Sequence, residues 1–326
     1  MIVWNSMLGA GSLRILRSLI LAIGTLFLIA ACEPQRSSPL QLGTNVWPGY
    51  EPLYLARSLQ LLDEDQIRLV EFVSASEVMR QFRNHHLDIA ALTLDEAIIL
   101  LDAGQEIEII MVLDVSDGGD VILGRAGTRS MAALTGKRIG VENTALGAYT
   151  LSRALEIRGM SLEDIIPVAL EVNEHFDAFM AGEVDAVVTF DPVRTRLLAQ
   201  GAVELFSSRE IPGEIVDVLV ARKGIAGSHP EALQHVADAW FGALDYLQQN
   251  PESAASLMQG RLKLAPAEIL ATYNQLQLPD RAGNRSLLVG EAPALLQTAA
   301  RLSEVMIADQ LIKESVDVRA LFGGHD

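Results

Sequence analysis

The chain has 326 residues, half of them apolar, and its 42 acidic residues outnumber 25 basic ones to give a formal net charge of −17. An acidic protein of this kind is a poor partner for nucleic acid or for anionic lipid surfaces. The length suits two domains, each large enough to bury its own hydrophobic core.

The first 31 residues are interpreted as a targeting segment rather than as part of the fold. Arg14 and Arg17 are their only charged residues, and the apolar run that follows is too short to span a bilayer comfortably. A basic start before a short apolar run is the layout of an export signal. We therefore expect an exported protein.

The end of this segment, Leu28-Ile29-Ala30-Ala31-Cys32, contains the only cysteine of the chain. It resembles the bacterial lipobox, which implies that Cys32 is acylated, becomes the mature N-terminus and anchors the protein to a membrane facing the periplasm or the cell exterior. The alternative is a plain secretory peptide with an incidental cysteine. Residues 32–39 are then a short polar tether.

From Leu40 onward, short aliphatic runs alternate with amphipathic ones, which is typical of βαβ units and a largely parallel sheet. The first half is predicted to contain strand Leu40–Asn45, helix Pro52–Leu61, strand Ile67–Phe72, helix Ser76–Arg83, strand Asp88–Leu92, helix Leu94–Ala103 and strand Ile107–Asp114. The second series is predicted as strand Arg138–Val141, helix Gly147–Arg158, strand Ile166–Leu170, helix Glu174–Ala181, strand Ala186–Thr189, helix Pro192–Ala199 and strand Ile215–Ala221. From Pro230 to the end, the sequence is predicted to be almost wholly helical.

Two stretches of the sequence repeat each other. Phe82 and Phe179 each stand near a helix end, and Asp88 and Asp185 follow six residues later, each leading an apolar strand. The repeat favours one helix–turn–strand unit used once per domain. Because the match is short, chance similarity is the alternative.

The chain also carries an ordered set of loop-and-strand motifs, Gly43-Thr-Asn-Val-Trp-Pro-Gly-Tyr-Glu-Pro52, Asp88-Ile-Ala-Ala-Leu-Thr93, Gly136-Lys-Arg-Ile-Gly-Val141, Gly182-Glu-Val-Asp-Ala-Val-Val188 and Asp191-Pro192. In this order the chain resembles the substrate-binding proteins of nitrate, sulfonate, taurine and thiamine-pyrimidine importers. The resemblance implies a type II periplasmic-binding-protein fold, an α/β architecture of two lobes joined by two crossover strands. It implies lobe 1 at 40–123 with 216–326, and lobe 2 at 124–215.

Ligands of open α/β sheets bind beyond the carboxyl ends of the strands. Trp47 and Tyr50 flank a Pro-Gly turn after the first strand, and we expect their exposed rings to form a platform for the ligand. A core position for either ring is the alternative. The other candidate ligand-binding residues in such loops are Thr93, Asp117, Asp120, Thr144 and Asp191.

Several of these candidates have a structural explanation as well. The spacing Thr93-Leu-Asp-Glu96 is that of a capping box, and Asp191-Pro192 is an ordinary helix start. Asp117 and Asp120 flank glycines that also suit a tight hairpin turn. Because the ligand loops contain acidic residues and lack Arg and Lys, we expect a neutral or cationic amine or nitrogen heterocycle, with a sulfonate or nitrate held by backbone N–H groups as the alternative.

Catalysis and metal binding find little support in the sequence. With Cys32 used by the anchor, no cysteine remains for a nucleophile, a disulfide or a zinc site, and the histidines lack ligand spacing. We expect no cofactor, no metal and no catalytic residue.

The expected partners are a small-molecule ligand and the permease of an ABC transporter. A sensory lipoprotein and a pyrimidine-synthase-like enzyme of the same fold are the competing interpretations.

Overall fold

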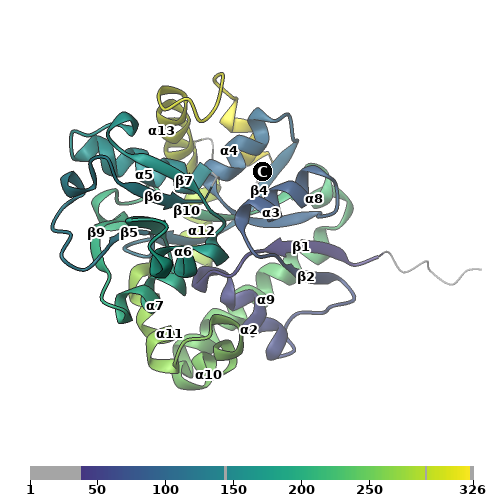
Figure 1. Cartoon of the computed structure of the whole chain (residues 1–326). Coiled ribbons are helices and arrows are strands. Elements are labelled where there is room, and N and C mark those ends of the chain that lie inside the picture. The colour runs from purple at the N-terminus through teal and green to yellow at the C-terminus, as the bar shows by residue number, and fades with distance from the viewer. Residues whose placement is uncertain (1–37, 143–144, 291, 324–326) are drawn as a thin grey trace, which may run out of the picture. The chain divides into compact units, whose positions relative to one another are not determined.

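A computed structural model describes residues 38–142, 145–290 and 292–323, and within it residues 39–326 form one compact unit. Cys32 and Thr144 lie outside the described residues, so the roles predicted for them stay predictions. Figure 1 shows strands and helices that alternate along most of the chain and a predominantly helical C-terminal third. The α/β fold class predicted from the sequence pattern is therefore confirmed.

The larger of two sheets has six strands in the order β11-β4-β10-β3-β1-β2. Their bounds are β1 Leu40–Thr44, β2 Ile67–Glu71, β3 Ile89–Thr93, β4 Ile107–Ser116, β10 Val216–Arg222 and β11 Leu276–Gln277. Strand β1 pairs in parallel with β2 and β3, whereas β10 is antiparallel to both β3 and β4. Because β10 inserts between β3 and β4, a strand late in the sequence completes the sheet that the first strands begin.

The smaller sheet has five strands in the order β7-β6-β8-β5-β9. Their bounds are β5 Val121–Gly124, β6 Arg138–Val141, β7 Ile166–Ala169, β8 Ala186–Thr189 and β9 Val203–Ser207. Strand β5 runs antiparallel to β8 and β9, as β10 does to its neighbours in the larger sheet. The sequence pattern did not predict β9, because Val203–Ser207 is only partly buried and lacks a continuous apolar run.

The chain passes between the sheets twice, after β4 and again before β10. The two crossings lie side by side, since Ser116 Oγ and Ser208 Oγ are 2.8 Å apart and Ser208 Oγ also accepts a hydrogen bond from the Gly118 backbone N–H at 2.7 Å. Strand β5 belongs wholly to the smaller sheet, so the predicted boundary at residue 123 falls inside a strand. The rest of the predicted division into lobes 40–123 with 216–326 and 124–215 stays a prediction.

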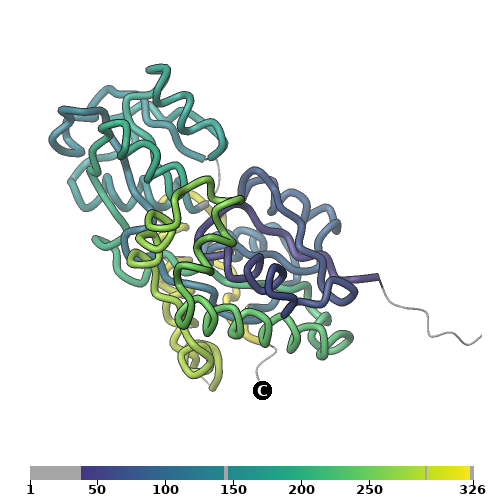
Figure 2. Tube along the Cα trace, turned by 90° about the horizontal axis from the view of Figure 1, so that it is seen from below, coloured from purple at the N-terminus to yellow at the C-terminus, as the bar shows by residue number. Residues whose placement is uncertain are grey.

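The helices cover the sheets and are bounded as follows: η1 Pro48–Tyr50, α2 Glu51–Ser58, α3 Ala75–Arg83, α4 Leu94–Asp102, α5 Ala145–Ile157, α6 His175–Ala181, α7 Val193–Ala199, α8 Ile225–Ser228, α9 Pro230–Gln249, α10 Pro251–Leu262, α11 Pro266–Thr272, α12 Arg281–Leu288 and α13 Ala294–Ala308. Helices α9 and α10 pack against α2, α12 packs against β4, and α13 packs against α4. Figure 2 shows the green C-terminal helices running beside the purple and blue N-terminal segments. The helical tail therefore packs on elements around the larger sheet.

The internal repeat predicted from the sequence is a repeat of structure. The Asp88 carboxylate accepts a hydrogen bond from the Gln41 backbone N–H at 2.8 Å, and the Asp185 carboxylate accepts one from the Arg138 backbone N–H at 2.9 Å. Each aspartate thus ties its own strand, β3 or β8, to the start of the parallel neighbour, β1 or β6. Both side chains therefore have a structural role.

An arginine completes each copy of this repeat. Arg222 ends β10, lies 4.2 Å from the Phe82 ring centroid and donates to the Phe82 carbonyl, while Arg125 follows β5, lies 4.8 Å from the Phe179 ring and donates to the Phe179 carbonyl. In both copies a cation therefore meets the carboxyl end of a helix, where the helix dipole favours positive charge.

Among the described residues, no helix is long and apolar enough to cross a membrane.

Candidate ligand-binding site

A small cavity lies at the carboxyl ends of the strands of the larger sheet, and elements around both sheets contribute to its wall. Its volume is about 20 Å³, and its lining consists of Asn45, Trp47, Tyr50, Ala75, Thr93, Glu96, Asp120, Leu146, Phe190 and Asp217. A cavity of this volume holds about one water molecule. A solute of several heavy atoms therefore enters only when the walls move apart.

The strand register explains why polar groups meet at this point. Asp217, near the start of the antiparallel strand β10, stands opposite Thr93 at the end of β3 and opposite Asp114 near the end of β4. Three neighbouring strands thus bring three polar side chains to one edge of the sheet. Apart from these positions, β3, β4 and β10 consist mainly of buried aliphatic residues.

Trp47 and Tyr50 lie in this cavity wall, but the prediction that their rings are exposed is wrong for this conformation. Trp47 is 5% and Tyr50 is 3% exposed. The Trp47 indole N–H donates to Asp114 Oδ2 at 3.1 Å, and the Tyr50 hydroxyl donates to Asp217 Oδ1. Each ring combines an apolar face with a hydrogen bond to a buried carboxylate, because the turn after β1 folds back over the ends of β4 and β10.

Phe190, in the loop after β8, closes the cavity from the side of the smaller sheet. Its ring meets the edge of the Trp47 ring, with the centroids 5.3 Å apart and the planes at 84°. Gly49 leaves the space that this arrangement needs, since an added Cβ would overlap Asp114 Oδ2 and Trp47 Nε1. The Pro-Gly turn is therefore required by close packing around the carboxylate.

Burial changes the acid–base state of the carboxyl groups around the cavity. Burial raises the pKa of Asp120 to about 7 and the pKa of Asp114 to about 7, against an ordinary value near 3.8. The pKa of Asp217 rises well above its usual range because of burial and the neighbouring Asp114, and that of Glu96 rises for the same reason beside Asp95. No Lys or Arg is found among the lining residues that the structure describes.

The structure brings together four of the predicted ligand-binding residues, Trp47, Tyr50, Thr93 and Asp120, in the wall of one cavity. Asp117 does not join them: its half-exposed side chain accepts a hydrogen bond from Gln277 at 3.4 Å and lies 3.6 Å from Arg209. Asp191 is buried outside the lining, where its Oδ1 accepts the Thr195 backbone N–H at 2.9 Å. That contact is the helix-start role weighed from the sequence.

Glu96, Asp114, Asp217 and Phe190 were not among the predicted site residues. For Asp114 and Asp217 the sequence does carry a signal, because a charged residue inside an apolar strand is rarely buried without a purpose. The predicted strands Ile107–Asp114 and Ile215–Ala221 contain these two residues. Their meeting depends on β10 pairing with β4 across a long sequence separation, which local patterns do not reveal.

A second cavity is larger but has different walls. It has a volume of about 220 Å³ and lies among α5, β6, β7 and the residues after α13, with Glu142, Ser152 and Asp309 as its polar lining residues. It is not at the strand ends of the larger sheet, and it lacks the aromatic rings that suit a small-molecule site. We therefore assign the ligand site to the smaller cavity.

Two sheets joined by two adjacent crossings, with a cavity walled from both, define the periplasmic-binding-protein fold that the sequence motifs imply. The NMT1-like family model matches residues 33–260, and the chain belongs to this family. Over 306 residues it is 24% identical to a protein of Escherichia coli (strain K12) named for aliphatic sulfonates binding, and the alignment covers 92% of each chain.

Solved structures show the same fold. The alkanesulfonate-binding protein SsuA of Xanthomonas axonopodis pv. citri, bound to MOPS, matches with a TM-score of 0.74 at 20% identity over 87% of this chain and 97% of its own. The periplasmic aliphatic sulphonate binding protein SsuA of Escherichia coli matches with a TM-score of 0.71 at 22% identity over 88% and 97%. The predicted family resemblance and fold class are thus confirmed.

Proposed function

We propose that this protein is the solute-binding component of an ABC-type importer, and that it captures a small molecule by closing two lobes over it. The observation that carries the proposal is the cavity wall, in which Trp47 and Asp217 from the larger sheet face Leu146 and Phe190 from the side of the smaller sheet. A ligand that contacts both sides stabilises the closed state by its differential affinity. The closed form then docks on a permease.

The lobes of this mechanism correspond to the two sheets, with the crossings at residues 117–120 and 208–215 as the hinge. A hinge needs a few connecting residues that absorb changes in backbone angles. The Escherichia coli sequence and structure named for sulfonate binding support a binding role rather than catalysis, and the structure, named as periplasmic, also supports export.

The ligand has two candidate classes, each with its own support. The relatives named for sulfonates favour an aliphatic sulfonate over the amine or nitrogen heterocycle expected from the sequence. The carboxylates in the cavity wall favour a ligand with a positive charge. A thermal-shift screen of the purified protein against alkanesulfonates, amines, pyrimidines and inorganic anions tests the proposal, because a cognate ligand raises the melting temperature with its concentration. A screen in which no small molecule shifts the melting temperature would contradict a solute-binding role.

We further propose that the protein is exported and anchored to a membrane through an acylated Cys32. The lone cysteine at the end of an export-type segment supports this assignment. Mass spectrometry of the membrane fraction should find a lipid-modified peptide beginning at residue 32, and Cys32→Ser should release the protein into the soluble fraction. Cleavage elsewhere with a free thiol at Cys32 would contradict the anchor.

A further inference from the structure

The cavity wall carries acidic side chains without basic partners. Glu96, Asp120 and Asp217 line it, and Asp114 lies directly behind Trp47. The Tyr50 and Trp47 donors satisfy one oxygen each of Asp217 and Asp114, and these two carboxyls also hydrogen-bond to each other, which requires that they share a proton in the absence of a counter-charge. Burying a carboxylate without a counter-charge is costly in free energy, so this arrangement is retained at the expense of stability.

One carboxylate oxygen in the wall accepts no well-formed hydrogen bond among the described residues, although the Thr93 hydroxyl lies near enough to this carboxyl to reduce the rise in its pKa that burial causes. Glu96 is 1% exposed, and its Oε2 accepts the Thr93 backbone N–H at 3.1 Å while its Oε1 accepts no hydrogen bond. A buried carboxylate oxygen in a cavity wall is the acceptor that a ligand N–H would satisfy. The missing hydrogen bond at Glu96 Oε1 is a separate observation from the number of acidic side chains around the cavity.

At two helix starts beside the cavity, backbone N–H groups that could hold an anion already donate to carboxylates of the chain itself. Glu96 occupies the start of α4, as described above. At the start of α3, the Ser76 backbone N–H and hydroxyl both donate to Glu142 Oε1, at 3.1 and 3.2 Å. Helix starts are the usual protein sites for sulfonate-like anions, and here carboxylates of the chain itself take that place.

We propose that the ligand of this site presents a protonated nitrogen with at least one N–H donor to Glu96 and Asp217, and lays its apolar part against Trp47 and Phe190. This inference rests on the proposed solute-binding function and names its substrate class as an organic cation. The rings suit that class, because aromatic faces attract cations as well as apolar groups. Among the described residues, no group of acidic side chains, histidines and cysteines has the arrangement of a metal site.

The test compares ligands with one carbon skeleton and opposite charge. We would measure binding of phenethylamine and 2-phenylethanesulfonate, and of propylamine and propanesulfonate, to the purified protein by calorimetry at pH 8. The amine of each pair should bind at least about tenfold more tightly, since a charge-assisted pair inside a desolvated site is among the stronger polar contacts. Tighter binding of the sulfonates would overturn the inference and leave the solute-binding function intact.

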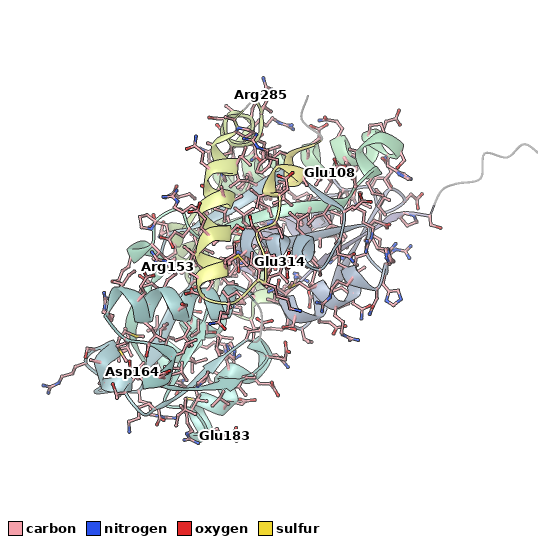
Figure 3. All side chains as sticks on the ribbon, turned by 90° about the horizontal axis from the view of Figure 1, so that it is seen from above. Glu108, Arg153, Asp164, Glu183, Arg285 and Glu314 are labelled. Atoms are coloured by element: carbon pink, nitrogen blue, oxygen red, sulfur yellow. The ribbon has the colours of Figure 1, made fainter. Side chains whose placement is uncertain are left out.

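Variants with matched controls complete the test. Glu96→Gln and Asp217→Asn keep the shapes and the acceptor oxygens but remove the charge, and each should weaken amine binding about tenfold or more. Glu183→Gln, at an exposed position labelled in Figure 3, and Asp177→Asn, also exposed, should leave it unchanged. Equal losses in all four variants, or none in any, would contradict the assignment.

A readout that needs no ligand keeps the inference testable if none of the four compounds binds. If the carboxylates are retained for a cation, Glu96→Gln and Asp217→Asn should each raise the melting temperature of the ligand-free protein at pH 8. The gain should shrink at pH 5, where the native carboxyls are protonated. A lower melting temperature for both variants at both pH values would show that the carboxylates serve stability, and would overturn the inference.

Discussion

The edge of the Phe190 ring meets the Trp47 ring across the cavity, with 5.3 Å between their centroids. Trp47 follows the first strand of the larger sheet and Phe190 follows the last parallel strand of the smaller one. The pair therefore joins the two parts of the chain at the point where a ligand would enter. The position of the Trp47 ring is fixed by a hydrogen bond to Asp114, whereas the Phe190 ring is held by packing alone.

Replacing Phe190 by Leu should weaken ligand binding more than it weakens the fold. The variant loses the edge contact, which is worth about 0.5–1.5 kcal/mol, and loosens the closed state, so affinity should fall about tenfold in a calorimetric titration. The melting temperature of the ligand-free protein is the control. A large fall in that temperature with unchanged affinity would show that Phe190 is only a core residue.

Gly49→Ala should disrupt the site by steric overlap. An added methyl group would displace the Trp47 indole or the Asp114 carboxylate, and breaking their buried hydrogen bond should cost about 1–3 kcal/mol. We expect a lower melting temperature and a loss of ligand binding. Gly260→Ala is the matched control, because nothing lies near the added methyl in α10 and the change should be neutral or stabilising. Equal behaviour of the two variants would contradict the steric argument.

The protein should be more stable in mild acid than in mild alkali. Burial raises the pKa of Asp114, Asp120 and Glu142 to about 7, so the folded protein binds protons that the unfolded chain releases near pH 4. Stability from a raised pKa is fully present below the unfolded value and is lost as the pH rises through about 7. Asp95 and Asp191 reinforce the shift at Asp120. Thermal unfolding at pH 5 and pH 8 checks this, and a higher melting temperature at pH 8 would contradict it.

The contact between Ser76 and Glu142 should favour the closed state. It links the start of α3, beside the larger sheet, to the end of β6 in the smaller one. Ser76→Ala removes the hydroxyl donor but keeps the backbone N–H, so the ratio of closed to open molecules should fall about fivefold for a loss of about 1 kcal/mol. Small-angle scattering of the ligand-free protein measures this shift. An unchanged scattering profile would mean that the contact follows closure without stabilising it.

The two arginines of the internal repeat should have parallel roles. Arg222→Met and Arg125→Met each remove a cation from a helix carboxyl end and from a phenylalanine ring, with an expected cost of about 1–3 kcal/mol. Hydrogen exchange should accelerate around α3 in the first variant and around α6 in the second. Arg285→Met, at the exposed position labelled in Figure 3, is the control and should leave both helices unchanged.

Much of the fold could be predicted because strand and helix periods are local. The apolar run Ile107–Asp114 predicted a buried strand, and β4 occupies Ile107–Ser116 beside β10. The repeat of Phe82 and Asp88 in Phe179 and Asp185 predicted a shared unit, since each aspartate must reach a neighbouring strand. The exposure of Trp47 was predicted wrongly, because the partner that buries it, Asp114, comes from a strand 67 residues away.

The site was only partly predictable for the same reason. Trp47 and Tyr50 follow the end of β1 and Thr93 ends β3, and general fold rules place ligand contacts at these strand ends. Asp217 is recruited by antiparallel pairing between β10 and β3, which depends on the return of the chain after the whole smaller sheet. The acidic side chain of Asp217 inside an apolar strand was a local signal of a special role, but that signal did not reveal which residues it would meet.

Strand β1 has a direction that bears on how the protein works at a membrane. The chain enters the sheet at Leu40 and reaches the cavity wall only beyond Thr44, five residues of about 3.3 Å each along the strand. The segment upstream of Leu40 therefore joins the sheet at the end opposite the cavity. If Cys32 carries the anchor proposed above, the cavity lies at the end of β1 farther along the chain from the lipid attachment. In that case residues 32–39, at most about 3.5 Å each, would set how far the protein extends from the membrane.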